Sequence, residues 1–313
     1  GVNLYYPAPA AATLQLGLVI AAIGLWRLAE IVAGRLGTLW IHRGERSGPT
    51  ARIFAASGAA ALVIGALGLL SILAMAVWSV AAAWRYPEAL PARWTATTWI
   101  GNADTRWRPA WATLVVGLTA SRIAAILTLA CLENEQRRRF HPGASALWLL
   151  YLPLLVPQIA FLFGTQVLLV RLRLDGSWVA VVWAHLLFVL PYVFLSLADP
   201  WRALDPRFAR SAAGLGASPL RVFCRVKLPM LLRPVLVALA VGFAVSVGQY
   251  LPTLFAGAGR IATLTTEAVT LSSGDDRRII GVYAFLQSAM PLLVYGGALA
   301  VPALLYRNRR GLQ

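Results

Sequence analysis

Seven long apolar segments constrain the fold of this sequence more than any other feature. A helix needs about 20 mostly apolar residues to cross the hydrocarbon core of a bilayer. The segments that approach or exceed this length are Ala11–Trp26, Ile53–Ala83, Ala110–Leu132, Ala146–Val170, Trp178–Leu197, Val235–Leu254 and Gly281–Tyr306. The first is short, and the third contains Ser121 and Arg122. The sequence therefore predicts an all-α polytopic membrane bundle of about seven transmembrane helices.

The composition supports a membrane protein. Hydrophobic residues make up 59% of the chain and charged residues 13%, whereas soluble domains carry about 25% charged residues. The net charge of +16 would also suit a nucleic-acid partner. However, the basic residues form short clusters between apolar runs, as they do in cytoplasmic loops of membrane proteins. We therefore expect membrane lipid around this chain and no nucleic-acid partner.

The charges of the loops predict the orientation in the membrane. The loops on the same side as the C-terminus carry eighteen Arg and Lys residues, and the loops on the opposite side carry nine. Because cytoplasmic loops are enriched in Arg and Lys, we predict a cytoplasmic C-terminus and a periplasmic N-terminus.

The sequence offers no site for catalysis or for a cofactor of its own. Lys227 is the only lysine, so no phosphate-binding GxxxxGK[ST] loop is present. The three histidines and two cysteines show no metal-ligand spacing. We therefore expect no catalytic residue, no metal and no cofactor in this chain, and any ATP hydrolysis would belong to a partner.

The loop between the fifth and sixth spans, Asp205–Pro229, carries the strongest local signal. Asp205 and Ser218 are each followed by proline, and an N-cap residue before a proline at the first helical position marks a helix start. The loop therefore predicts two short helices, over about Pro206–Ala213 and Pro219–Val226.

The segment Gly214-Leu215-Gly216 between these helices predicts a hinge, because glycine permits a positive φ or a close backbone approach. The second helix is basic on one side. Its other side is apolar, through Leu220, Val222, Phe223 and Val226. A cytoplasmic helical hairpin with exposed apolar residues favours a partner groove.

This loop resembles the EAA loop of binding-protein-dependent ABC importer permeases, the MetI-like superfamily. In that loop an acidic-Ala-Ala start precedes a glycine, and a branched apolar residue and Leu-Pro follow at fixed spacing. Arg210 stands at the family's acidic position. The residues that the resemblance assigns to ATPase coupling are Asp205, Arg210, Ala212, Gly216, Ala217, Ser218, Pro219, Phe223, Val226, Leu228 and Pro229.

The resemblance covers about residues 94–310. Tyr151–Gln158 and Trp183–Tyr192 are similar to the YnjC-type branch of the superfamily, near the thiamine, iron and polyamine permeases. The resemblance implies a core of about six helices in a bacterial inner membrane, paired with a second permease half around one pore. It also implies a cytoplasmic ABC ATPase dimer, which would bind ATP and Mg, and a periplasmic substrate-binding protein.

We interpret residues 1–52 as the last helix of a preceding permease half plus a cytoplasmic linker. A family half ends in an out-to-in helix and a basic tail, and Gly281–Gln313 has this form too. Residues 53–313 would then be the permease module, and the native reading frame would extend upstream of Gly1. The alternative is that the first span is an accessory helix.

Polar residues recur at helical spacing within three spans and mark candidate pathway positions. Side chains seven residues apart share a helix face, as do Tyr151, Gln158 and Thr165. The candidates are Gln158, Thr165, His185, Tyr192, Ser246, Gln249, Thr253 and Arg122. The alternative role is interhelical hydrogen bonding, worth about 0.6–2 kcal/mol each. We expect Arg122 to face the bundle or a wet cavity, because an arginine at a helix centre costs about 2.5–3.5 kcal/mol on an insertion scale.

Our prediction is therefore a permease subunit of an ATP-driven importer for a small polar solute. An ion-gradient-driven secondary transporter is the main alternative, but it would need intramembrane acids, which the spans almost wholly lack. A membrane enzyme is a further alternative, but it would need a nucleophile–base or metal constellation. Thiamine-like cations, metal complexes and polyamines all fit the resemblance.

Overall fold

The computed structural model describes residues 7–43, 50–84, 88–101, 103–140, 142–272, 274 and 277–307. These residues are helical apart from turns, loops and one small antiparallel strand pair. The strands are β1, Ala81–Ala83, and β2, Arg93–Trp94. The prediction of an all-α helical bundle is confirmed.

The helices follow one another along the chain with short connections. They are α1 Pro7–Arg43, α2 Thr50–Val80, α3 Thr97–Ile100, α4 Ala103–Arg138, α5 Ala144–Leu155, α6 Gln158–Arg171, α7 Trp178–Arg202, α8 Pro206–Gly214, α9 Pro219–Val222, α10 Leu228–Met230, α11 Leu232–Val247, α12 Leu251–Gly257, α13 Leu264–Leu271 and α14 Arg277–Leu305. A π-helix, η2, covers Phe223–Lys227 between α9 and α10.

Four helices within the described residues are long and apolar enough to cross a membrane: Phe54–Val80, Trp107–Arg138, Trp178–Arg202 and Arg277–Leu305. A fifth span is reached if α9–α10 and α11, which are bent by 77°, count as one. The predicted count of seven is higher partly because two of the predicted spans are broken.

The predicted span Ala146–Val170 is not one helix. It divides into α5 and α6 at Val156, whose backbone is extended at φ −81° and ψ 139°. Proline follows Val156, and a residue before proline is disfavoured in the α region. The predicted span Val235–Leu254 is likewise divided, because α11 ends at Val247 and α12 begins at Leu251.

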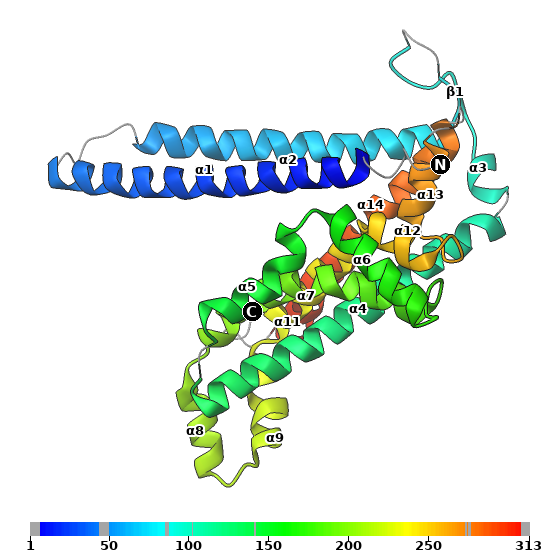
Figure 1. Cartoon of the computed structure of the whole chain (residues 1–313). Coiled ribbons are helices and arrows are strands. Elements are labelled where there is room, and N and C mark those ends of the chain that lie inside the picture. The colour runs from blue at the N-terminus through cyan, green and yellow to red at the C-terminus, as the bar shows by residue number, and fades with distance from the viewer. Residues whose placement is uncertain are drawn as a thin grey trace.

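The first predicted span, Ala11–Trp26, extends further than the sequence suggested. It lies mostly in the N-terminal half of α1, a single helix of 37 residues that continues to Arg43. Part of the expected linker is therefore helical, and residues 44–49 lie outside the described residues. In Figure 1, α1 and α2 extend away from the remaining helices, and α2 joins them mainly by contacting α14.

The core of the bundle is formed by α4, α7 and α11, which cross one another at close range (Figure 1). Small residues permit this approach, as is common between membrane helices. A Cβ atom on Gly117 of α4 would lie 2.8 Å from the Phe243 ring of α11. A Cβ atom on Gly242 of α11 would lie 2.6 Å from Cγ2 of Val193 on α7. The three backbones are therefore held together at glycine contacts.

Candidate functional site

The loop Asp205–Pro229 leaves one end of this core as a helical hairpin, with α8 and α9 at the bottom of Figure 1. Both predicted caps are present. The Asp205 side chain accepts a hydrogen bond from the backbone N–H of Arg207 at 2.8 Å. The Ser218 side chain accepts one from the backbone N–H of Arg221 at 3.4 Å. The two helix starts inferred from the Asp-Pro and Ser-Pro pairs are confirmed.

The hinge between the two helices depends on Gly216. Its φ of +83° lies in the left-handed region, which a side chain with a Cβ atom rarely adopts. No atom lies within 4 Å of the position that a Cβ atom would take. The positive φ is as predicted, whereas the structure shows no close approach between Gly216 and its own chain.

The second helix of the loop is shorter than predicted. The α-helix ends at Val222 and passes into the π-helix Phe223–Lys227, which includes Val226. Val222 is buried, and Phe223 packs against Trp201 with ring centroids 5.9 Å apart. The predicted apolar side is thus divided: its later residues turn toward the bundle, and Leu220 remains exposed.

Three large apolar side chains of the hairpin face solvent. Leu215 is 90% exposed and Leu220 is 70% exposed, and Phe208 is exposed as well. Leu215 lies at the hinge, while Phe208 and Leu220 lie on α8 and α9. We call these three residues the apolar tip. An exposed apolar group of this kind marks a surface for contact with a protein or a membrane.

The base of the hairpin is anchored by Lys227, which is 4% exposed. Its Nζ donates to Glu133 Oε2 at 2.6 Å and to Gln136 Oε1 at 2.7 Å. It also lies 5.8 Å from the centroid of the Trp201 ring. The opposite Glu133 oxygen, Oε1, accepts from Arg137 Nε at 2.7 Å. We call Lys227, Glu133 and Gln136 the lysine anchor, because it ties the loop to α4.

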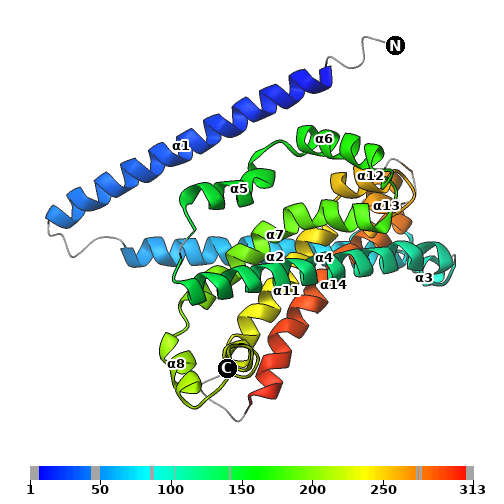
Figure 2. The same ribbon diagram turned by 60° about the horizontal axis from the view of Figure 1, so that its bottom comes forward.

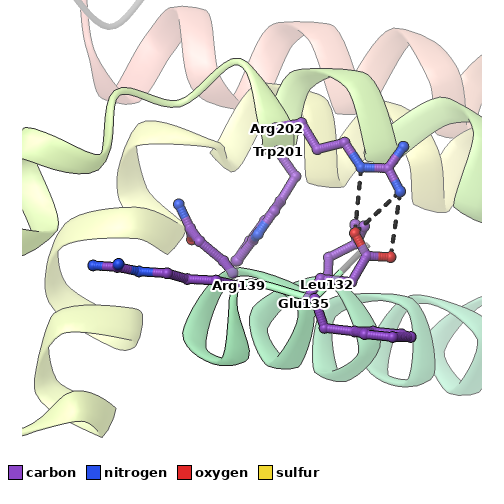
Figure 3. Close-up of a pocket in the computed structure, with 7 residues that line it drawn as sticks. Leu132, Glu135, Arg139, Trp201 and Arg202 are labelled. Carbon is purple, nitrogen blue, oxygen red and sulfur yellow. Dashed lines mark hydrogen bonds and ion pairs between the residues drawn. The ribbon is translucent and has the colours of Figure 1, made fainter. Parts of the chain in front are cut away.

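A second ion pair joins the ends of α4 and α7 beside this anchor. Arg202 Nη2 lies 3.1 Å from Glu135 Oε2, and Figure 3 shows the guanidinium reaching from α7 to the carboxylate on α4. The pair borders a cavity of about 410 Å³, whose lining includes Arg139 and Trp201. The helices that meet the loop are therefore cross-linked at their ends by charge.

Sequence reasoning missed the lysine anchor. Lys227 and Glu133 are 94 residues apart, and no periodicity connects positions on different helices. One signal was present: Lys227 is the only lysine, and Glu133 belongs to a chain with only 12 acidic residues.

The candidate pathway residues of the fifth and sixth predicted spans come together inside the bundle. His185 Nδ1 lies 2.7 Å from Ser246 Oγ, and its Nε2 lies 2.8 Å from Thr253 Oγ1. Thr253 also donates to the Gln249 carbonyl at 2.8 Å. All four residues are buried. The expected inward orientation is present, with the histidine bridging α7, α11 and α12.

The remaining candidates do not join this group. Thr165 is buried and donates to the Phe161 carbonyl at 3.1 Å, while Gln158 and Tyr192 are exposed. The prediction that Tyr151 shares a face with Gln158 and Thr165 is wrong, because the break at Val156 separates α5, which contains Tyr151, from α6, which contains the other two. Seven-residue spacing has no meaning across that break.

Arg122 is exposed on α4. It does not face the bundle of this chain, which corrects one of the two expectations for it. Among the described residues, no group of three or more His, Cys, Asp or Glu side chains is placed to hold a metal ion.

Comparison with known families decides the class of this bundle. Residues 142–306 match the family described as "Binding-protein-dependent transport system inner membrane component". This stretch is more than half of the chain and contains the capped hairpin, the lysine that anchors it and the His185 cluster. The chain belongs to this family. It is accordingly a multi-pass inner-membrane protein of the ABC permease class.

Curated relatives point the same way. The chain is 44% identical over 200 residues to the inner membrane ABC transporter permease protein YnjC of Escherichia coli, a match that covers 64% of this chain and 38% of YnjC. It is 27% identical over 178 residues to the putrescine transport system permease protein PotI of Escherichia coli, covering 54% of this chain and 63% of PotI.

A third relative is named for the transport of a different solute. The chain is 31% identical over 169 residues to the molybdenum transport system permease protein ModB of Mycobacterium tuberculosis, covering 49% of this chain and 64% of ModB. The chain thus spans less than two thirds of the length of each of these three relatives.

Proposed function

We propose that this chain is a permease domain of an ATP-driven, binding-protein-dependent importer of a small polar solute. The hairpin Asp205–Pro229 would couple it to a separate ATPase. The observation that carries this proposal is the apolar tip, which is exposed beyond the end of a membrane bundle. A hairpin of this kind fits the groove of a partner protein.

The alternative, a secondary transporter driven by an ion gradient, has less support. Such proteins use acidic side chains within the membrane as relays for ions. In the four described spans the acids Glu133, Glu135 and Asp199 all lie within two turns of a span end. Glu133 and Glu135 are also paired with basic side chains.

The partners follow from this proposal. A dimer of ABC ATPase subunits would bind ATP and Mg on the cytoplasmic side, a second permease half would complete the pore, and a periplasmic protein would deliver the solute. We place residues 1–52 in the end of a preceding half and residues 53–313 in the permease module. The nearly complete exposure of the described side chains of α1 supports this division, because such a helix needs other apolar partners or lipid.

The lysine anchor supplies a route for coupling. Force applied at the apolar tip would pass through the π-helix to Lys227, and from there to Glu133 on α4. Because α4 also packs on α7 and α11, movement of the loop would be transmitted to the core of the bundle. The anchor would thus act by positioning α4 and not by contacting the solute.

The orientation is tested by cysteine labelling of the intact protein in membranes. The native Cys131 and Cys224 are both exposed and are first replaced by serine. Cysteines introduced near Asp104 and Gly274 should react with impermeant reagents from outside, and cysteines near Glu135 only from inside. The opposite pattern would overturn the proposed topology.

The coupling role is tested at the apolar tip. We expect the Leu215→Ser/Leu220→Ser variant to insert normally but to copurify with its ATPase at least about tenfold less, since losing about 1.4 kcal/mol of contact lowers affinity tenfold. Ala213→Ser, on the same hairpin, is the matched control. Full copurification by the double variant would remove the docking proposal.

A further inference from the structure

Arg122 is placed where an arginine is least expected. The span that contains it runs from Trp107 to Arg138, so Arg122 lies about 15 residues, or more than about 20 Å, from either end. Because the hydrocarbon core of a bilayer is about 30 Å thick, a residue at the centre of this span lies about 15 Å from either interface, beyond the reach of its side chain. Its side chain is nevertheless exposed.

Arg122 has no neutralising charge beside it among the residues that the structure describes. Within the described residues it forms no ion pair, and the acids of the described spans are confined to span ends. Arginine stays protonated in proteins. An unpaired guanidinium against lipid tails is costly, so water or another protein must cover this part of α4.

The other polar candidates do not place a charge on the exposed surface of a span. His185, Ser246 and Thr253 satisfy one another inside the bundle. Gln158 and Tyr192 are exposed but carry no charge. Away from the last two turns at either end, Arg122 is the one charged side chain within the four described spans.

Arg122 belongs to a continuous stripe on α4. Arg108, Trp111, Leu118, Arg122 and Ile126 recur at intervals of three, four or seven residues, which places them on one helix face. All are exposed or half-buried. In Figures 1 and 2, α4 lies on the outside of the bundle, and the described helices leave its outward side uncovered.

The end of the stripe opposite the hairpin opens on a basic cavity of about 330 Å³. Its lining includes Arg108 and Trp111 from α4, together with Trp178 and Arg260. The Arg260 guanidinium donates a long hydrogen bond, 3.5 Å, to the Asp175 carbonyl. Two arginines thus lie at one end of the stripe and a third lies at its centre.

We propose that this stripe lines the solute pathway and that Arg122 makes the pathway selective for small anions. The inference rests on the proposed function, because it assumes that the uncovered side of α4 faces the pore and not lipid. A fixed positive charge within a low-dielectric channel attracts anions and repels cations. Arg108 and Arg260 would draw the anion in, and Arg122 would stabilise it midway across the membrane.

Access to water is the first test. In membrane vesicles that hold the full-length protein with its partners, and with Cys131 and Cys224 replaced by serine, the Arg122→Cys variant is treated with anionic and cationic methanethiosulfonates. It should react in at least one nucleotide state, and Arg108→Cys serves as the accessible control. The buried neighbour Ser121→Cys should remain unreactive. If Arg122→Cys stays unreactive in every state, lipid or a partner protein covers the stripe, and the proposal is overturned.

Charge selectivity is the second test, measured one turn away. In the Ile126→Cys variant the rate ratio of the anionic to the cationic reagent should fall about fivefold or more when Arg122→Gln is added. Arg122→Lys should preserve the ratio. An unchanged ratio would refute anion selection. Neither measurement requires ATP-driven uptake, so failure of the coupling proposal, seen with the apolar tip variant, is distinguished from failure of this one.

Discussion

The bundle core and the coupling hairpin distribute their polar and apolar side chains in opposite ways. The core buries polar groups, as in the contacts of His185 with Ser246 and Thr253. The hairpin exposes apolar groups, above all Leu215 and Leu220. In lipid a polar group must find its partners within protein, whereas in water an exposed leucine has no benefit until a partner covers it.

This difference separates groups that find their contacts within this chain from groups that need a partner molecule. His185, Ser246 and Thr253 find their hydrogen-bond partners within this chain, so their first effect is on folding. The side chains of the apolar tip remain largely uncovered by the described residues of this chain, so their first effect is on assembly. The lysine anchor lies between them, since it is buried like the core yet belongs to the hairpin.

The strongest test of this division is Gly216→Val. Valine disfavours the φ of +83° that the hinge requires, so the hairpin would change direction while the spans remain intact. We expect normal insertion but no ATP-driven uptake, together with weaker ATPase copurification. Gly214→Ala is the control, because Gly214 is helical and has open space around it. Normal uptake by Gly216→Val would contradict the coupling role of the hairpin.

The lysine anchor is tested by removing its positive charge while Glu133 stays in place. Lys227→Met should lower the free energy of unfolding by about 3 kcal/mol, because breaking a buried ion pair typically costs about 3–5 kcal/mol and Glu133 keeps its contact with Arg137. Thermal unfolding in detergent measures the change. Adding Glu133→Leu should recover much of the loss.

The exposed ion pair Arg27–Glu30 provides a matched comparison for the anchor. Arg27→Gln should change the free energy of unfolding by less than about 1 kcal/mol. Equal effects of Lys227→Met and Arg27→Gln would show that burial does not distinguish the anchor from a surface pair.

The His185 cluster should show a smaller effect on folding. His185→Phe removes two hydrogen bonds inside the bundle, each worth about 0.6 kcal/mol on average between membrane helices, or about 1.2 kcal/mol together. Thr253 keeps its bond to the Gln249 carbonyl. We therefore expect a modest loss of thermal stability and an equally modest loss of uptake. Abolished uptake in a stable protein would instead place the cluster in the pathway.

The smallest effect is expected at Arg210, which occupies the family's acidic position and is exposed. Arg210→Glu should alter the free energy of unfolding and the rate of uptake very little, because exposed charges contribute about 0–1 kcal/mol. Loss of uptake without loss of stability would show that Arg210 contacts an acidic group on the ATPase.

Local chemistry made part of this structure predictable. Asp205 and Ser218 define their helix starts through a side-chain oxygen and a following proline, and both signals lie within a few residues. The positive φ of Gly216 follows in the same way, because few other residues adopt it. The long spans are predictable because apolar length alone determines them.

Features that depend on competition or on distant contacts were not predictable. At Val156 a single proline competes with a long run of apolar residues. The length of that run favoured one continuous helix, whereas the structure has a break. The π-helix Phe223–Lys227 follows from no local pattern that we recognise. The bond between Lys227 and Glu133 joins residues 94 positions apart, and only the packing of α4 against the loop brings them together.

The lysine anchor also makes the side chains of this chain unreactive toward amine-directed reagents. Lys227 carries the only side-chain primary amine in the sequence, and the contacts with Glu133 and Gln136 shield it from water. Amine-directed cross-linkers should therefore fail to capture partners through the side chains of this chain, however close those partners lie. Acylation of Lys227, if it occurs during turnover, would report the moment at which the hairpin separates from α4.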